Sequence, residues 1–141
     1  MPYVSKTSLG AFFLTFFFGF SFGYDYNRYM PFIVIDLETT GLNAQSDSII
    51  EIALLRIDAS GNTLDSWSSL IHPGFVIHED ITFLTSITPE DLADAPKFSE
   101  VRDTIIQFVG KDPIMGHNVG FDIAFLAANG IRFETEKIVD T

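Results

Sequence analysis

Apolar residues between positions 30 and 141 fall into short runs separated by polar turns. Runs of this length, rich in β-branched residues, are typical of strands in a largely buried sheet. They predict five strands, at residues 32–36, 48–58, 63–71, 113–116 and 138–140. Only a short Gly-Asn turn joins the second and third runs, so these two strands should form an antiparallel hairpin.

Helix signals occupy the second half of the chain, at residues 89–95, 99–109 and 119–128. Thr88 is an N-cap followed by proline at the first helical position, and Asn118 is expected to cap the third helix. Residues 75–87 are interpreted as a loop. Three strands in a meander, followed by alternating helices and strands, predict an α/β fold with a mixed sheet and helices on both faces.

The first 29 residues differ in kind from the rest of the chain. They contain 7 of the 15 phenylalanines and all 4 tyrosines, and no charged residue lies between Thr7 and Tyr24. Three interpretations are open: upstream sequence preceding a start at Met30, a signal peptide, or a membrane anchor from Thr7 to Tyr24, which is marginal in length. We therefore divide the chain into an apolar leader, residues 1–29, and a folded domain, residues 30–141.

Composition narrows the function classes. The chain has no cysteine, which excludes disulfides, thiolate metal sites and a cysteine nucleophile. Its formal net charge is −11, and because the leader carries +1, residues 30–141 carry −12. A domain with this negative charge is not expected to bind nucleic acid mainly through a basic surface.

Two acids flank Leu37 at the end of the first predicted strand. Because side chains alternate along a strand, Asp36 and Glu38 should point to the same side. Like charges at this spacing repel each other, and a bound Mg²⁺ or Mn²⁺ would relieve the repulsion. The turn that follows, Thr39-Thr40-Gly41, has small side chains and could admit a nucleotide beside the acids. The simpler alternative is a strand end with two solvated acids.

A third acid, Asp122, lies in the first turn of the helix expected at residues 119–128. The apolar stripe of this helix is interpreted as Phe121, Ala124, Phe125 and Ala128, which places Asp122 at the border of the buried face. Taken alone, Asp122 is explained as an acid that interacts favourably with the helix dipole.

The segments VIDLETTGL, with Asp36 and Glu38, and GHNVGFDIAFL, with Asp122, resemble two motifs of the DEDD superfamily of 3′–5′ exonucleases. The intervening IIEIALLRID, LIHPG and LTSITPEDLADAPKFSEV follow the same order and spacing. Within this superfamily, the motifs resemble those of the exonuclease (epsilon) subunits of bacterial DNA polymerase III and their stand-alone relatives. The resemblance implies a ribonuclease-H-like fold and metal-dependent hydrolysis at the single-stranded 3′ end of DNA, with a DNA polymerase subunit as an expected partner.

The resemblance also implies roles for individual residues. Two Mg²⁺ (or Mn²⁺) ions would be held by Asp36, which bridges them, together with Glu38 and Asp122. The terminal nucleotide would lie against Thr39, Gly41 and Leu42. The path of the strand would be lined by Asn118 and Phe121.

Superfamily members carry a third motif, a histidine followed about five residues later by an aspartate, on a helix after the fifth strand. The sequence stops at Asp140-Thr141, so we expect an incomplete domain at the C-terminus and weak or no activity. The histidines present are expected to be structural: His72, His78 and His117. Two alternatives stay open, a 3′–5′ exoribonuclease and a non-catalytic nucleic-acid-binding remnant. The protein is expected in the cytoplasm, or at a membrane if Thr7–Tyr24 is a genuine anchor.

Overall fold

The computed structural model describes residues 30–134 and 138–141, so the expectations for the leader, residues 1–29, lie outside it. The described residues form a five-stranded sheet in the order β3-β2-β1-β4-β5. The strands are β1 (Phe32–Thr39), β2 (Ile49–Ile57), β3 (Thr63–Leu70), β4 (Ile114–Gly116) and β5 (Ile138–Asp140). All five strands expected from the sequence are therefore present, with ends shifted by at most three residues.

The sheet is mixed, as predicted. β1 pairs antiparallel with β2, and β2 with β3, so the first three strands form a meander. β4 runs parallel to β1, and β5 runs parallel to β4. β1 is central and carries neighbours on both sides, which explains why its sequence is an almost continuous apolar run. The carboxyl ends of β1 and β4 consequently meet at the same edge of the sheet.

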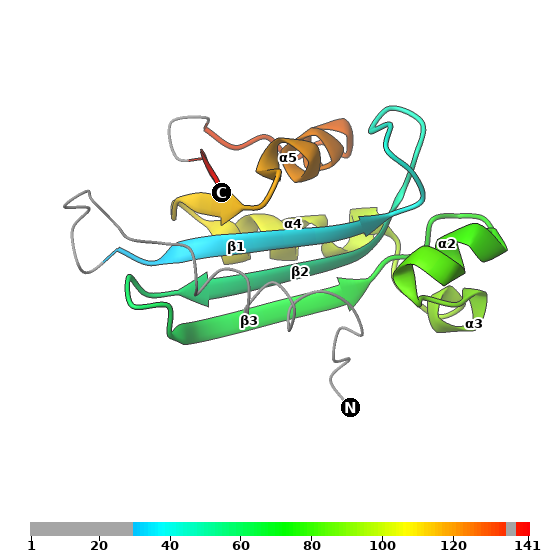
Figure 1. The fold of residues 1–141 in the computed structure, drawn as a ribbon, viewed down its shortest axis with the longest axis horizontal. Coiled ribbons are helices and arrows are strands. Elements are labelled where there is room, and N and C mark those ends of the chain that lie inside the picture. The colour runs from blue at the N-terminus through cyan, green and yellow to red at the C-terminus, as the bar shows by residue number, and fades with distance from the viewer. Residues whose placement is uncertain (1–29, 135–137) are drawn as a thin grey trace.

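Four helices are described: α2 (Glu79–Thr85), α3 (Pro89–Leu92), α4 (Phe98–Val109) and α5 (Val119–Ala128). Figure 1 shows α2 and α3 beyond the end of the sheet toward which β1 and β3 run. The expected short helix after Thr88 is confirmed, and its cap is a full capping box with Asp91. The bounds of α5 are those predicted.

The expectation of a loop over residues 75–87 is wrong, because α2 lies within it. The His78 ring accepts a hydrogen bond from the N–H of Asp80 and so caps the helix, a function for which histidine is an unusual residue. Phe83 and Leu84 are 87% and 76% exposed. The helix therefore has no continuous apolar stripe that the sequence pattern could reveal.

Helices on both faces of the sheet were also expected, and this is wrong for the described helices. Side chains of α4 and α5 pack into the same core cluster, around Ile33, Ile35 and Phe125. The connections from β3 to β4 and from β4 to β5 step across the sheet in the same direction, and right-handed crossovers then place both helices on one face. The opposite face carries a smaller cluster of strand residues: Phe32, Val34, Leu55, Ile57 and Met115.

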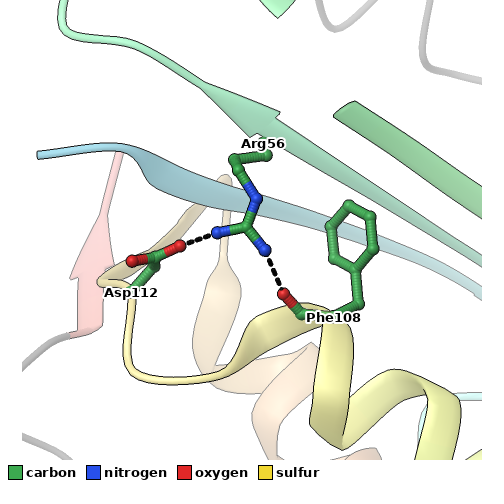
Figure 2. A network of polar contacts seen from close by, with 3 residues as sticks. All are labelled: Arg56, Phe108 and Asp112. Atoms are coloured by element: carbon green, nitrogen blue, oxygen red, sulfur yellow. Dashed lines mark hydrogen bonds and ion pairs between the residues drawn. The ribbon is translucent and has the colours of Figure 1, made fainter. Parts of the chain in front are cut away.

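Arg56 connects α4 to the sheet near the beginning of β1, away from the carboxyl end of that strand (Figure 2). Its guanidinium forms an ion pair with Asp112 and donates a hydrogen bond to the carbonyl of Phe108. The same group lies 5.2 Å from the centroid of the Phe108 ring. Arg56 thus satisfies a carbonyl in the last turn of α4, where no helical N–H is left to do so.

Within the part of the chain that the structure describes, no helix has the length and apolar character needed to cross a membrane.

Candidate active site

Asp36 and Glu38 lie on the same face of β1, as the alternation predicted. Across the antiparallel pair, Asp36 faces Ala53 and Glu38 faces Glu51. Leu37 points the other way and is buried in the main core cluster. The register is regular up to Glu38 and shifts immediately after it, between Glu38 and Thr39. The two acids therefore occupy the last regularly paired positions of the central strand.

Asp122 is brought to the same edge from α5. It is 6% exposed, and its Oδ1 accepts a hydrogen bond of 3.1 Å from the N–H of Leu37. β4 pairs with the earlier part of β1, at Ile33 and Val34. The Asp122 carboxylate therefore accepts a hydrogen bond from the β1 backbone at a point past the residues that pair with β4. This bond connects the third acid to the strand that carries the other two.

The position of Asp122 on its helix corrects one expectation. Asp122 lies within the buried face of α5, not at its border; the buried residues are Val119, Asp122, Phe125 and Leu126. Ala124 and Ala128 were expected to be buried and are exposed. Nearly every residue of α5 is apolar or small, so the sequence pattern does not single out one stripe.

Burial and mutual repulsion shift the proton equilibria of these acids. Burial, and then the negative charge of Glu51, raise the pKa of Asp36 from 3.8 to about 6. Burial and then the charge of Asp36 raise the pKa of Asp122 from 3.8 to about 7, against the lowering effect of the Leu37 hydrogen bond. Glu38 adds a smaller increase at Asp122. Near neutral pH, the ionisation of each carboxyl group at this edge therefore becomes less favourable when its neighbours are already ionised.

The turn after β1 is tightly built. The Thr39 hydroxyl donates a hydrogen bond of 2.6 Å to the carbonyl of Gly41. A Cβ atom on Gly41 would lie 2.4 Å from Oδ2 of Asp47, so only glycine fits here without displacing that carboxylate. Leu42 is 88% exposed at the start of the following loop. The three residues expected to meet a terminal nucleotide thus form one short segment beside Asp36 and Glu38.

Asn118 and Phe121 lie on the other side of the same edge, where β4 passes into α5. Asn118 is the N-cap residue of α5 by position, in the left-handed region at φ 52°, but its side chain makes no capping hydrogen bond. The expected side-chain cap is therefore wrong; the N–H of Val119 instead donates to Oδ1 of Asp140, at 3.3 Å. Phe121 is partly buried, with its ring centroid 4.8 Å from that of Phe125.

Glu51 was not among the residues singled out from the sequence. It is 2% exposed and faces Glu38 across the β1–β2 pair, so it joins Asp36 and Glu38 as a third carboxylate on this face of the sheet. The signal was present in the sequence, because Glu51 is the one acid in β2 and every other residue of this strand except Arg56 is apolar.

Two of the three histidines have structural roles, as expected. Nδ1 of His72 accepts a hydrogen bond of 2.9 Å from the N–H of Gly74, and His78 caps α2. His117 directly precedes Asn118 and is exposed.

The acids fit a divalent cation in their chemistry. Mg²⁺ and Mn²⁺ prefer carboxylate oxygens, and a cation would offset the repulsion that, after burial, raises the pKa values of Asp36 and Asp122. In their present arrangement, however, no three Asp, Glu, His or Cys side chains of residues 30–134 and 138–141 surround one point as metal ligands.

Comparison with known sequences assigns the chain to a family. Residues 33–141 match the exonuclease family, RNase_T. A PolC-type DNA polymerase III of Pediococcus pentosaceus is 36% identical over 107 residues, which cover 76% of this chain and 7% of that protein. The DNA polymerase III subunit epsilon of Aquifex aeolicus is 38% identical over 95 residues, covering 67% of this chain and 46% of the subunit. The chain therefore spans less than half the length of either relative.

Solved structures of E. coli exonuclease I share the fold at 23% identity. The complex with a dT13 oligonucleotide aligns with a TM-score of 0.60 over 69% of this chain and 22% of that one. A zinc-bound form of its complex with single-stranded DNA aligns with a TM-score of 0.61 over the same shares. The resemblance to DEDD exonucleases of ribonuclease-H-like fold is confirmed by these matches. Since the family match includes both acidic motifs and most of the chain, the protein belongs to the exonuclease family, RNase_T.

Proposed function

We propose that this protein is a metal-dependent 3′–5′ exonuclease that hydrolyses terminal phosphodiester bonds of DNA and releases nucleoside monophosphates. The observation that carries the proposal is the meeting of Asp36, Glu38 and Asp122 at one edge of the sheet, close enough for the charges of Asp36 and Glu38 to add to the effect of burial in raising the pKa of Asp122. The similarity to a DNA polymerase III epsilon subunit supports DNA as the substrate and a polymerase subunit as a partner.

The chain's own residues would divide the work as follows. Asp36, Glu38 and Asp122 would hold two Mg²⁺ (or Mn²⁺) ions, which supply charge neutralisation at the phosphate and promote attack by water. The segment Thr39–Leu42 would receive the terminal nucleotide, with the exposed Leu42 offering an apolar surface to the base. Asn118 and Phe121, at the start of α5, would line the path of the strand.

We further propose that the 141-residue chain cleaves slowly. His72 and His78 are engaged in local backbone hydrogen bonds, so neither is expected to act as the general base. Loss of a general base slows such reactions about 10²–10⁴-fold.

The test is degradation of a single-stranded oligodeoxynucleotide with a fluorophore at its 5′ end. We expect a ladder that shortens from the 3′ end with Mg²⁺ or Mn²⁺, and no ladder with EDTA or with Asp36→Asn. The exposed Asp103, on α4, provides the matched control, because Asp103→Asn makes the same chemical change away from the site. Equal degradation by both variants would disprove the role of Asp36. An RNA oligonucleotide degraded faster than the DNA would favour the exoribonuclease, and binding without cleavage would favour the non-catalytic remnant.

A further inference from the structure

Glu51 is a buried acid in an otherwise apolar stretch of strand. Apart from Arg56, every residue of β2 is buried, and Glu51 is its one acid, with an exposed fraction of 2%. Buried carboxylates are rare in proteins because removing an ionised group from water is costly. An apolar residue at this position would make a more stable sheet. The acid therefore lowers stability, and a role in function would explain its presence.

The register of the sheet places Glu51 beside the candidate active site. Glu51 faces Glu38 directly, and Ala53, two residues further along β2, faces Asp36. Opposite residues in an antiparallel pair share a face, with Cβ atoms about 4.5–5.5 Å apart. Ala53 is itself buried, with an exposed fraction of 2%, and its methyl group adds no charge beside Asp36. Glu51 therefore shares one surface with Asp36 and Glu38, and it approaches them from the neighbouring strand.

Glu51 makes this surface more negative, at a cost in stability. Two like charges on directly opposite strand positions are destabilising. The charge of Glu51 is also felt at Asp36, whose pKa it raises after the larger effect of burial. A divalent cation bound at this surface attracts each of these carboxylates, and this attraction outweighs the repulsion between them.

We infer that Glu51 is a positioning residue of the active site, whose buried charge acts through Glu38 and Asp36 to raise the affinity of the site for divalent cations. It does so from beside the acids that would hold the ions. The inference rests on the proposed metal-dependent function.

A purely structural role is the competing explanation. Glu51 could instead serve the fold through hydrogen bonds of its carboxylate oxygens to neighbouring groups. Glutamine has the same size and keeps one carbonyl oxygen as an acceptor, but it carries no charge. Glu51→Gln therefore separates the effect of charge from that of shape. Glu90, exposed on α3, gives the matched control, since Glu90→Gln makes the same chemical change at a solvent-exposed position outside the sheet.

The experiment measures Mn²⁺ binding to the 141-residue chain by titration calorimetry, together with thermal unfolding with and without Mn²⁺. For Glu51→Gln we expect Mn²⁺ affinity to fall about 10–100-fold, the range typical of residues adjacent to metal ligands. Its metal-free melting temperature should equal or exceed that of the wild type, and its Mn²⁺-induced increase should shrink. Glu90→Gln should bind Mn²⁺ with nearly wild-type affinity. Glu51→Asp, which keeps the charge, should restore most of the lost affinity.

Cleavage assays complete the test. The Mg²⁺ concentration for half-maximal rate should rise with Glu51→Gln in proportion to the lost affinity, while the rate at saturating Mg²⁺ changes little. Equal Mn²⁺ affinities of Glu51→Gln and Glu90→Gln would overturn the inference, as would a wild-type chain that binds no Mn²⁺. If neither Glu51→Gln nor Glu51→Ala folds, the role is structural and the inference is wrong. If the wild type binds Mn²⁺ without cleaving DNA, the proposed function fails, and the affinity ratio still decides the role of Glu51.

Discussion

Replacing Asp122 with asparagine should stabilise the metal-free protein at neutral and alkaline pH. The pKa of Asp122 rises from 3.8 to about 7 on folding, mainly through burial and then through the charge of Asp36. Each unit of pKa difference corresponds to 1.36 kcal/mol, so the ionised carboxylate lowers the free energy of unfolding by about 4 kcal/mol. Asparagine removes the charge and keeps an oxygen that can accept the hydrogen bond from the Leu37 N–H.

The sign of the pH dependence follows from the same pKa values. Because its pKa is higher in the folded state, Asp122 binds more protons there, and wild-type stability falls as the pH rises from about 4 to about 7. Asp122→Asn lacks this contribution. The two proteins should therefore be nearly equal in stability at pH 4, and should differ by about 4 kcal/mol at pH 8.

Urea denaturation in EDTA at pH 4 and pH 8 measures this difference. For a slope of about 2 kcal/mol per molar urea, the midpoint of Asp122→Asn should lie about 2 M above that of the wild type at pH 8. The control Asp103→Asn should show no such change, because Asp103 is exposed. A variant less stable than the wild type at pH 8, or a difference independent of pH, would refute the reasoning. Cleavage of DNA should be lost at least about 100-fold with Asp122→Asn, despite the gain in stability.

Three further substitutions test the surroundings of the site. Gly41→Ala should lower the free energy of unfolding by about 1–3 kcal/mol, since its Cβ would displace the Asp47 carboxylate. The loss should be smaller in an Asp47→Ala background. Urea midpoints of the wild type, the two single variants and the double variant measure both losses, and equal losses in the two backgrounds would contradict the reasoning. Arg56→Ala should cost about 1–3 kcal/mol in unfolding free energy and leave the cleavage rate unchanged, because the Asp112 network lies away from the acids; a slower rate in the folded variant would disprove this separation. Ser86→Gly should raise the free energy of unfolding by about 0.5–1 kcal/mol, because Ser86 ends α2 in the left-handed region, at φ 61°, which glycine adopts without strain. A lower melting temperature of this variant would contradict the reasoning.

The features that local chemistry controls could be predicted from the sequence. The central strand is an apolar run because it has neighbours on both sides, and the hairpin between β2 and β3 follows from a short turn. The shared face of Asp36 and Glu38 needs only the alternation of side chains along a strand. α5 begins and ends where its sequence predicts.

The features that depend on contacts between distant segments could not be predicted in this way. The buried face of α5 is chosen by the sheet beneath it, and so Asp122 is buried where a uniformly apolar helix offered several stripes. The site-facing position of Glu51 depends on the register between β1 and β2, which no property of β2 alone reveals. α2 was missed because Phe83 and Leu84 point to solvent, against the rule that apolar residues mark the buried side of a helix.

The hydrogen bond from Leu37 to Asp122 gives the protein a built-in spectroscopic reporter. This amide proton is bound to a carboxylate, whereas its neighbours along β1 lie within the sheet's backbone pairing. Protonation of Asp122, or an ion that draws its oxygen away, changes the electron density at that one amide. The ¹⁵N–¹H resonance of Leu37 should therefore shift with pH and with added cation, and its hydrogen exchange with solvent should quicken when the carboxylate leaves. The resonance of one backbone amide thus reports whether Asp122 is protonated and whether a cation is bound beside it.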